Sequence, residues 1–125
     1  MDWKVDFYQE PDGAAPVEAF LEALSIERRA KALALIQELR RQGPALPFPY
    51  SSQVAGRIRE LRTQYGEEKI RILYFGDSER NFILLHGLIK RSDKLEKSDI
   101  AVAADMMAKH EARLMQKPRA KGKRR

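Results

Sequence analysis

The chain has 125 residues, of which 43% are hydrophobic, and a formal charge of +6, which fits one domain around a single core and leaves little room for a second. It contains no cysteine and two histidines, which excludes disulfides and thiol catalysis and argues against a structural zinc site, so no metal or other cofactor is expected. The first residues lack the apolar core of a signal peptide and no apolar run is long enough to span a bilayer, so we expect a cytoplasmic protein.

Positive charge is concentrated in two parts of the chain. Residues 57–94 hold nine Lys/Arg against six Asp/Glu, whereas residues 1–56 hold six against eight. Residues 114–125 add six basic side chains and no acid, so residues 1–113 are neutral, with eighteen of each sign. We therefore expect one domain over 1–113 and a basic, disordered tail over 114–125. The tail either strengthens binding to a polyanion, by an amount that falls with salt, or is a solvated end of no consequence.

The first half of the chain predicts a strand followed by two helices. Apolar and polar residues alternate over 3–8, which indicates a half-buried strand, and the turn residues 11–13 end it. Apolar residues recur at helical spacing over 17–24, which predicts a short helix. Ser25 is placed to cap a second helix, which the Gly-Pro pair at 43–44 ends. Together the two helices predict a hairpin.

The second half predicts strands and a last helix. The proline-rich residues 44–50 predict an extended link that crosses the surface. Residues 58–63, 69–75 and 81–89 then predict three strands whose short loops imply an antiparallel meander, and the third, apolar on both alternating sets, is expected to lie centrally. A final helix is predicted from residue 98 or 99 to about 114. The expected fold is α+β, with element order β-α-α-β-β-β-α and the helical hairpin packed on the sheet.

Charged residues sit among the core-forming residues of the predicted strands. Because neighbouring strands hold side chains at fixed spacings, we expect Glu60, Arg62 and Arg71 to converge across the sheet. Such cations suit the binding of a phosphodiester. The alternative is that Glu60 merely forms an ion pair with an adjacent arginine, as many structural networks do.

Three motifs in this region resemble RelE/HigB-like toxins of type II toxin-antitoxin modules, in the RelE/ParE superfamily, and most of all their phage-derived HigB-like branch. They are the ELR of residues 60–62, the RILYF of residues 71–75, and the LLHGLIKR of residues 84–91 with Lys94 following. The resemblance extends in element order over residues 3–108 and implies a RelE/ParE-like fold. It also implies a ribosome-dependent mRNA endonuclease, with the ribosome and mRNA as partners and a cognate antitoxin, often a helix-turn-helix protein.

The resemblance implies a metal-independent reaction in which a ribose 2'-hydroxyl attacks its own 3'-phosphate. Arg71 matches the arginine that would bind the scissile phosphate, since a guanidinium stays charged and grips two oxygens at once. Lys90, Arg91 and Lys94 match the basic end of the last strand, where one of them would stabilise the transition state or donate a proton. Glu60 is the candidate base or the orienting partner of an arginine.

A second set of residues is expected to contact RNA directly: Arg57, Arg59, Arg62, Tyr74 and His86. Arg62 is the second candidate phosphate clamp. Tyr74 could stack on a base or belong to the core, and His86 fits a core or supporting position better than a proton shuttle. His110 is expected to be exposed.

Two further functions remain open from the sequence. One is a ParE-like toxin, which shares this architecture but inhibits DNA gyrase by protein contact. The other is a non-catalytic module that binds RNA or the ribosome through the same basic residues. The chain also departs from the HigB-like pattern, with Arg59 and Ile70 where aromatic residues are common and Leu95-Glu96 after Lys94.

Overall fold

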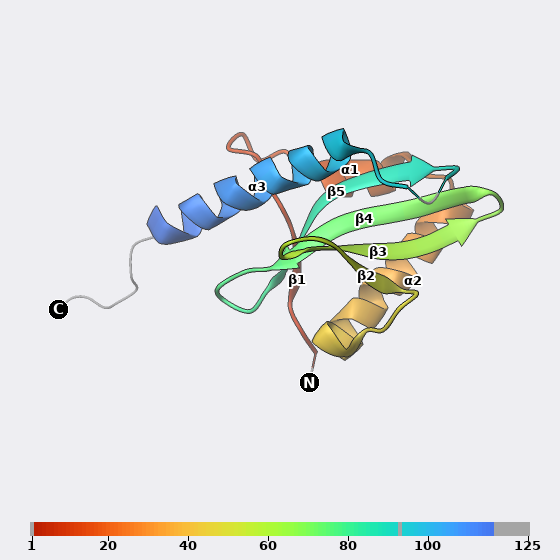
Figure 1. Ribbon diagram of the computed structural model, residues 1–125, viewed down its shortest axis with the longest axis horizontal. Helices are drawn as coiled ribbons and strands as arrows, with labels where there is room; N and C mark the ends of the chain where they lie inside the picture. The colour runs from red at the N-terminus through yellow and green to blue at the C-terminus, as the bar shows by residue number, and fades with distance from the viewer. Residues whose placement is uncertain (1, 93, 117–125) are drawn as a thin grey trace.

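Strands and helices follow the periodicities of the sequence closely. The computed structural model describes residues 2–92 and 94–116, and these contain five β-strands and three α-helices (Figure 1). The helices are α1 (Pro16–Ala23), α2 (Ile26–Gln42) and α3 (Lys97–Gln116), and a short 3-10 turn, η1 (Gly43–Ala45), follows α2. The strands are β1 (Val5–Phe7), β2 (Ser51–Ala55), β3 (Ile58–Tyr65), β4 (Glu68–Gly76) and β5 (Phe82–Lys90). The predicted α+β class is confirmed.

All five strands belong to one sheet, in the order β1-β5-β4-β3-β2. β3, β4 and β5 form the predicted antiparallel meander, and β1 joins the outer side of β5 in parallel. β5 is therefore an interior strand, although β4 and not β5 lies at the centre. The strand β2, which the sequence did not predict, pairs antiparallel with β3 and forms the other edge.

Helices cover the two faces of the sheet differently. α1 and α2 pack on one face and α3 packs on the other, as Figure 1 shows for α2 and α3. The cluster under α1 and α2 contains Leu21, Leu35, Leu39, Leu61 and Ile72. The cluster under α3 contains Leu73, Phe75, Leu85 and Ala103. The helical hairpin therefore packs on the sheet as predicted.

The boundaries of α2 follow the predicted signals, whereas α3 runs past its predicted end. The Ser25 hydroxyl accepts a hydrogen bond from the Arg28 N–H at 3.3 Å, as an N-cap does. At the other end Gly43 has φ of +55°, and a Cβ there would lie 2.3 Å from Nε1 of Trp3, so only glycine fits. α3 continues to Gln116, beyond the expected start of the tail at residue 114, and residues 117–125 lie outside the described part of the chain. Within the described ranges, no helix is both long and apolar enough to cross a membrane.

Candidate functional site

The strand register places four cations on one face of the sheet. Arg62 on β3 lies opposite Arg71 on β4, and in the next row Lys69 on β4 lies opposite Lys90 on β5. Paired residues point to the same side of a sheet, and so do residues two apart along a strand. Arg62, Lys69, Arg71 and Lys90 therefore share the side that carries α3, and we call these four residues the basic face.

Glu60 lies between the two arginines of the basic face. Its Oε2 accepts a hydrogen bond from Nη1 of Arg62 at 2.9 Å, and its Oε1 lies 3.6 Å from Nε of Arg71. The side chains of Glu60 and Arg71 are both buried in this arrangement. The structure thus confirms that the three residues converge, and it gives Glu60 the geometry of an orienting partner for both arginines.

Arg62 is the more accessible of the two arginines. Nη1 of Arg71 donates to the carbonyl oxygens of Thr63 at 2.8 Å and Ile70 at 3.0 Å, and the side chain is only 4% exposed. The Arg62 side chain is 21% exposed, and its guanidinium carbon lies 5.5 Å from the centre of the Phe48 ring. Both arginines line an open hollow of about 200 Å³, whose other lining residues are Pro49, Tyr50, Thr63 and Gln64. An anion in this hollow would meet Arg62 first, with the charge of Arg71 behind it.

Two polar atoms of this cluster have no hydrogen-bond partner within the described residues. They are Oε1 of Glu60 and Nε of Arg62, and both are buried. Unsatisfied buried polar atoms cost stability and are rare in folded proteins, so they tend to mark places where function rather than stability fixed the residues.

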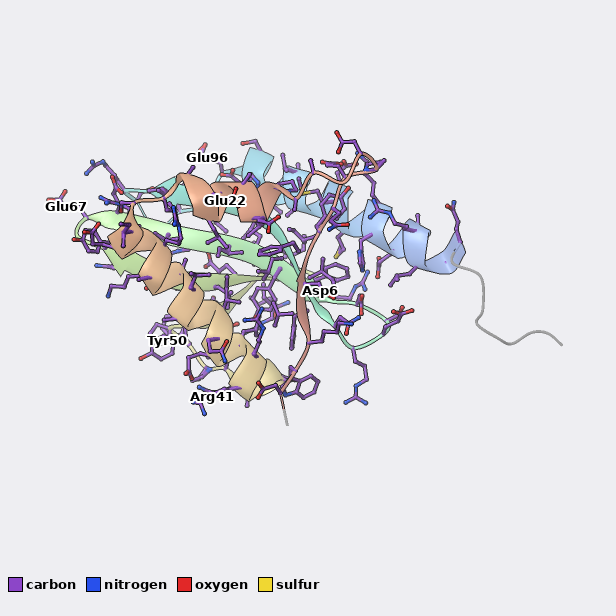
Figure 2. The ribbon with its side chains drawn as sticks, turned by 180° about the vertical axis from the view of Figure 1, so that it is seen from behind. Asp6, Glu22, Arg41, Tyr50, Glu67 and Glu96 are labelled. Carbon is purple, nitrogen blue, oxygen red and sulfur yellow. The ribbon has the colours of Figure 1, made fainter. Side chains whose placement is uncertain are left out.

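The three basic residues at and after the end of β5 have different surroundings. Lys90 is largely buried on the basic face, and its Nζ lies 3.9 Å from Oε2 of Glu96, just before α3 (Figure 2). Arg91 is exposed and lies 3.6 Å from Glu67, which Figure 2 labels at the tip of the β3–β4 hairpin. Lys94 is exposed in the connection to α3. Of the three, Lys90 alone is placed beside Arg71 by the strand register.

Three of the residues expected to contact RNA point elsewhere. Arg57 forms a two-pronged ion pair with Glu111 on α3, with N–O distances of 2.5 and 2.8 Å. Arg59 and Tyr74 face each other across β3 and β4 on the opposite side of the sheet, against α1 and α2. Tyr74 is 2% exposed and its hydroxyl lies 2.6 Å from that of Ser51, so its burial excludes base stacking. Because side chains alternate between the two sides along β3 and β4, the sequence could have predicted that Arg59 and Tyr74 lie on the side opposite Arg62 and Arg71.

Both histidines connect α3 to the sheet. Nε2 of His86 on β5 lies 3.0 Å from Oδ1 of Asp99, in the first turn of α3. His110, expected to be exposed, is instead largely buried, with its Nε2 2.9 Å from Oδ2 of Asp77. Burial raises the pKa of Asp77, but hydrogen bonds from His110 and from two backbone N–H groups outweigh it, so the net pKa lies below the usual value. Because Asp77 and His110 are 33 residues apart, no local pattern could reveal the pair.

A cavity of about 400 Å³ lies beside the Asp77–His110 pair. Its lining mixes both signs of charge and includes Lys4, Asp6, Glu79 and Arg113. In residues 2–92 and 94–116, no three His, Asp or Glu side chains come close enough together to hold a metal ion. Side chains of both signs line this cavity, whereas the four residues of the basic face are all positively charged.

Most of the chain matches the sequence model of a known protein family. The sequence model of the family described as phage-derived protein Gp49-like (DUF891) matches residues 19–108. These residues include the helical hairpin from within α1 onward, the whole meander and the first half of α3, and with them the basic face and Glu60. No curated protein matches the chain.

Proposed function

The chain belongs to the phage-derived Gp49-like family, and from this premise we propose that it is the toxin of a type II toxin-antitoxin module and cleaves ribosome-bound mRNA. The family is a toxin-like one, which supports the module and an antitoxin partner. The RNA target and the ribosome are the further part of this proposal. It rests on one observation, the arrangement of Glu60 between Arg62 and Arg71 at a hollow open to solvent.

The basic face suits the negative charge that develops at phosphorus. In the proposed reaction the 2'-oxygen bonds to the adjacent phosphorus, the bond from phosphorus to the 5'-oxygen breaks, and the 2'-proton is lost while the 5'-oxygen gains one. Arg62 would contact the phosphate in the hollow, and Arg71 would add its charge from behind. Glu60 fixes both guanidinium groups, which lowers the entropy lost when the phosphate binds.

Lys90 is the residue on the basic face that could protonate the leaving 5'-oxygen. It lies one row from Arg71 on the same side of the sheet, and it is largely buried. An ammonium group placed there is a general acid that could donate a proton as the bond from phosphorus to the 5'-oxygen breaks. Glu96, with its Oε2 at 3.9 Å from Nζ of Lys90, would hold the ammonium group in place.

Cleavage of a reporter mRNA in a cell-free translation extract tests the proposed nuclease activity. We expect wild-type protein to cut the message within its translated part, and Arg62→Gln to cut roughly 30-fold more slowly, from a loss of about 2 kcal/mol of transition-state stabilisation. Arg41→Gln is the matched control, because Arg41 is exposed at the end of α2 (Figure 2) and forms an ion pair with Glu38 on the same helix. Growth arrest with intact RNA and blocked DNA supercoiling would refute the nuclease and favour a gyrase inhibitor.

A second candidate is a non-catalytic module that binds RNA or the ribosome. It is favoured by the surroundings of Glu60, the acid nearest the two arginines. Glu60 is buried and paired with both of them, which leaves it poorly placed to remove a proton from a substrate. In this case Arg62→Gln would weaken binding to translating ribosomes while the message remained whole with every variant.

A further inference from the structure

Two large aromatic rings are exposed next to the hollow at Arg62. Phe48 is 71% exposed and Tyr50 is 52% exposed, in the segment between η1 and β2. Burying a ring of this size is strongly favourable, so two such rings left in solvent call for an explanation. The sequence suggested only a link for this segment. We call residues 47–50 the aromatic arm.

The aromatic arm is held in place by the neighbouring strand. The backbone N–H groups of Tyr50 and Ser51 both donate to the Pro47 carbonyl, at 2.9 and 3.1 Å. The N–H of Arg62 donates to the Tyr50 carbonyl at 2.9 Å, and Leu46 anchors the start of the arm in the core. The rings are therefore presented on a fixed backbone, which reduces the entropy lost on binding a ligand.

The arm brings flat rings next to a fixed cation. The guanidinium of Arg62 lies over Phe48, 5.5 Å from the ring centre, while its Nη1 is fixed by Glu60. Tyr50 lines the hollow together with Arg62 and Arg71. Figure 2 shows Tyr50 at the outside of the molecule, beside α2. A ring for a base and a cation for a phosphate are thus adjacent.

We propose that Phe48 and Tyr50 form a base-stacking platform for single-stranded RNA whose backbone lies on Arg62. Every base has a flat face that stacks on an aromatic ring, and a neighbouring arginine neutralises the phosphate. RNA explains the surface better than an apolar protein partner does, because the hollow beside Tyr50 is lined by two arginines, Arg62 and Arg71, whereas charged residues are depleted at the core of protein–protein interfaces. This inference rests on the proposed function, since it assumes that the ligand is RNA.

Two ligands of equal charge separate stacking from phosphate binding. One is a labelled 2'-O-methyl RNA of about eight nucleotides, which 2'-hydroxyl attack cannot cleave, and the other is a base-free strand of the same length. Fluorescence anisotropy should show that wild-type protein binds the base-bearing strand roughly ten-fold more tightly. The six basic side chains of residues 117–125 act on both ligands alike, so their effect cancels in the ratio.

Removing the Phe48 ring should change the ratio of the two affinities, and substitutions outside the arm should not. Phe48→Ala should remove most of the preference for bases while leaving affinity for the base-free strand unchanged. Phe48→Tyr keeps the ring and should keep the preference. Arg62→Gln should weaken binding of both strands by a similar factor. Ile26→Ala, at an exposed apolar residue at the start of α2, should behave as wild type.

The outcomes for the platform and for the nuclease can be told apart. If wild type binds both strands equally, or if Phe48→Ala keeps the preference for bases, the platform is wrong even where the extract shows cleavage. If wild type prefers bases and Phe48→Ala does not, while the extract shows no cleavage, the stacking platform is supported and the nuclease activity is refuted.

Discussion

At the scale of single residues, Glu60 decides how the two arginines of the basic face are arranged. The convergence of Glu60, Arg62 and Arg71 was predictable, because a short hairpin loop fixes the register of β3 and β4. The same alternation places Arg59 and Tyr74 on the other side, so applying it to every strand residue would have removed both from the expected site. Phe48 and Tyr50 could not be predicted, because their exposure depends on how the arm rests against β3.

Neutralising Glu60 should destabilise the protein. In Glu60→Gln the buried guanidinium of Arg71 loses its carboxylate partner and Arg62 keeps at best a neutral acceptor, so we expect the free energy of unfolding to fall by about 3 kcal/mol. Urea unfolding followed by circular dichroism measures this. Glu67→Gln is the control, since Glu67 is exposed and its ion pair with Arg91 lies at the surface. Equal stability of the two variants would mean that Glu60 does not hold the arginines together.

At the scale of elements, the helices and the meander follow from the sequence and β2 does not. Ser25, Gly43 and the apolar spacing specify α2, and three apolar runs with short loops specify the meander. Residues 51–55 have little apolar alternation of their own. They form a strand because they pair with the free edge of β3. This pairing is a tertiary contact, which the local sequence pattern cannot predict.

The contact of α1 with β5 depends on the absence of a side chain at Gly87. A Cβ at this residue would lie 2.4 Å from the Phe20 ring, whereas a Cβ at Gly76 would lie 3.8 Å from Phe82. We therefore expect Gly87→Ala to displace α1 and to lower the free energy of unfolding by roughly 1–3 kcal/mol. Gly76→Ala, also in the sheet, should be close to neutral. Similar melting temperatures for the two variants would contradict this packing.

At the scale of the whole molecule, the two helical layers are attached to the sheet by different forces. α1 and α2 bury a broad apolar surface, whereas Ala103 is the one fully buried residue of α3 among those described. Polar contacts supplement this attachment at both ends of α3: His86 with Asp99, His110 with Asp77, and Arg57 with Glu111. The sequence predicted the helix but not these long-range pairs.

The attachment of α3 should weaken in acid. Because the net pKa of Asp77 is lowered in the folded state, its contribution to stability is present above its unfolded pKa of about 4 and is lost as the pH falls through the lower folded value. The Arg57 guanidinium lowers the pKa of Glu111 in the same sense. Asp77→Asn should therefore be less stable than wild type by about 2 kcal/mol at neutral pH. Urea unfolding at several pH values from neutral down to about 2 should show the difference in unfolding free energy between wild type and Asp77→Asn becoming smaller. A difference that does not change with pH would contradict the role of the Asp77 charge.

RNA phosphate is expected to bind at Arg62 and Arg71 on the basic face, and the arginine Nε–H signals in a ¹H–¹⁵N NMR spectrum report on both side chains. On titration with uncleavable 2'-O-methyl RNA, we expect the largest shifts for Arg62 and Arg71, with Arg80 in the turn between β4 and β5 unchanged. Shifts centred on Arg113, beside the cavity at Asp77 and His110, with Arg62 and Arg71 unaffected, would contradict it.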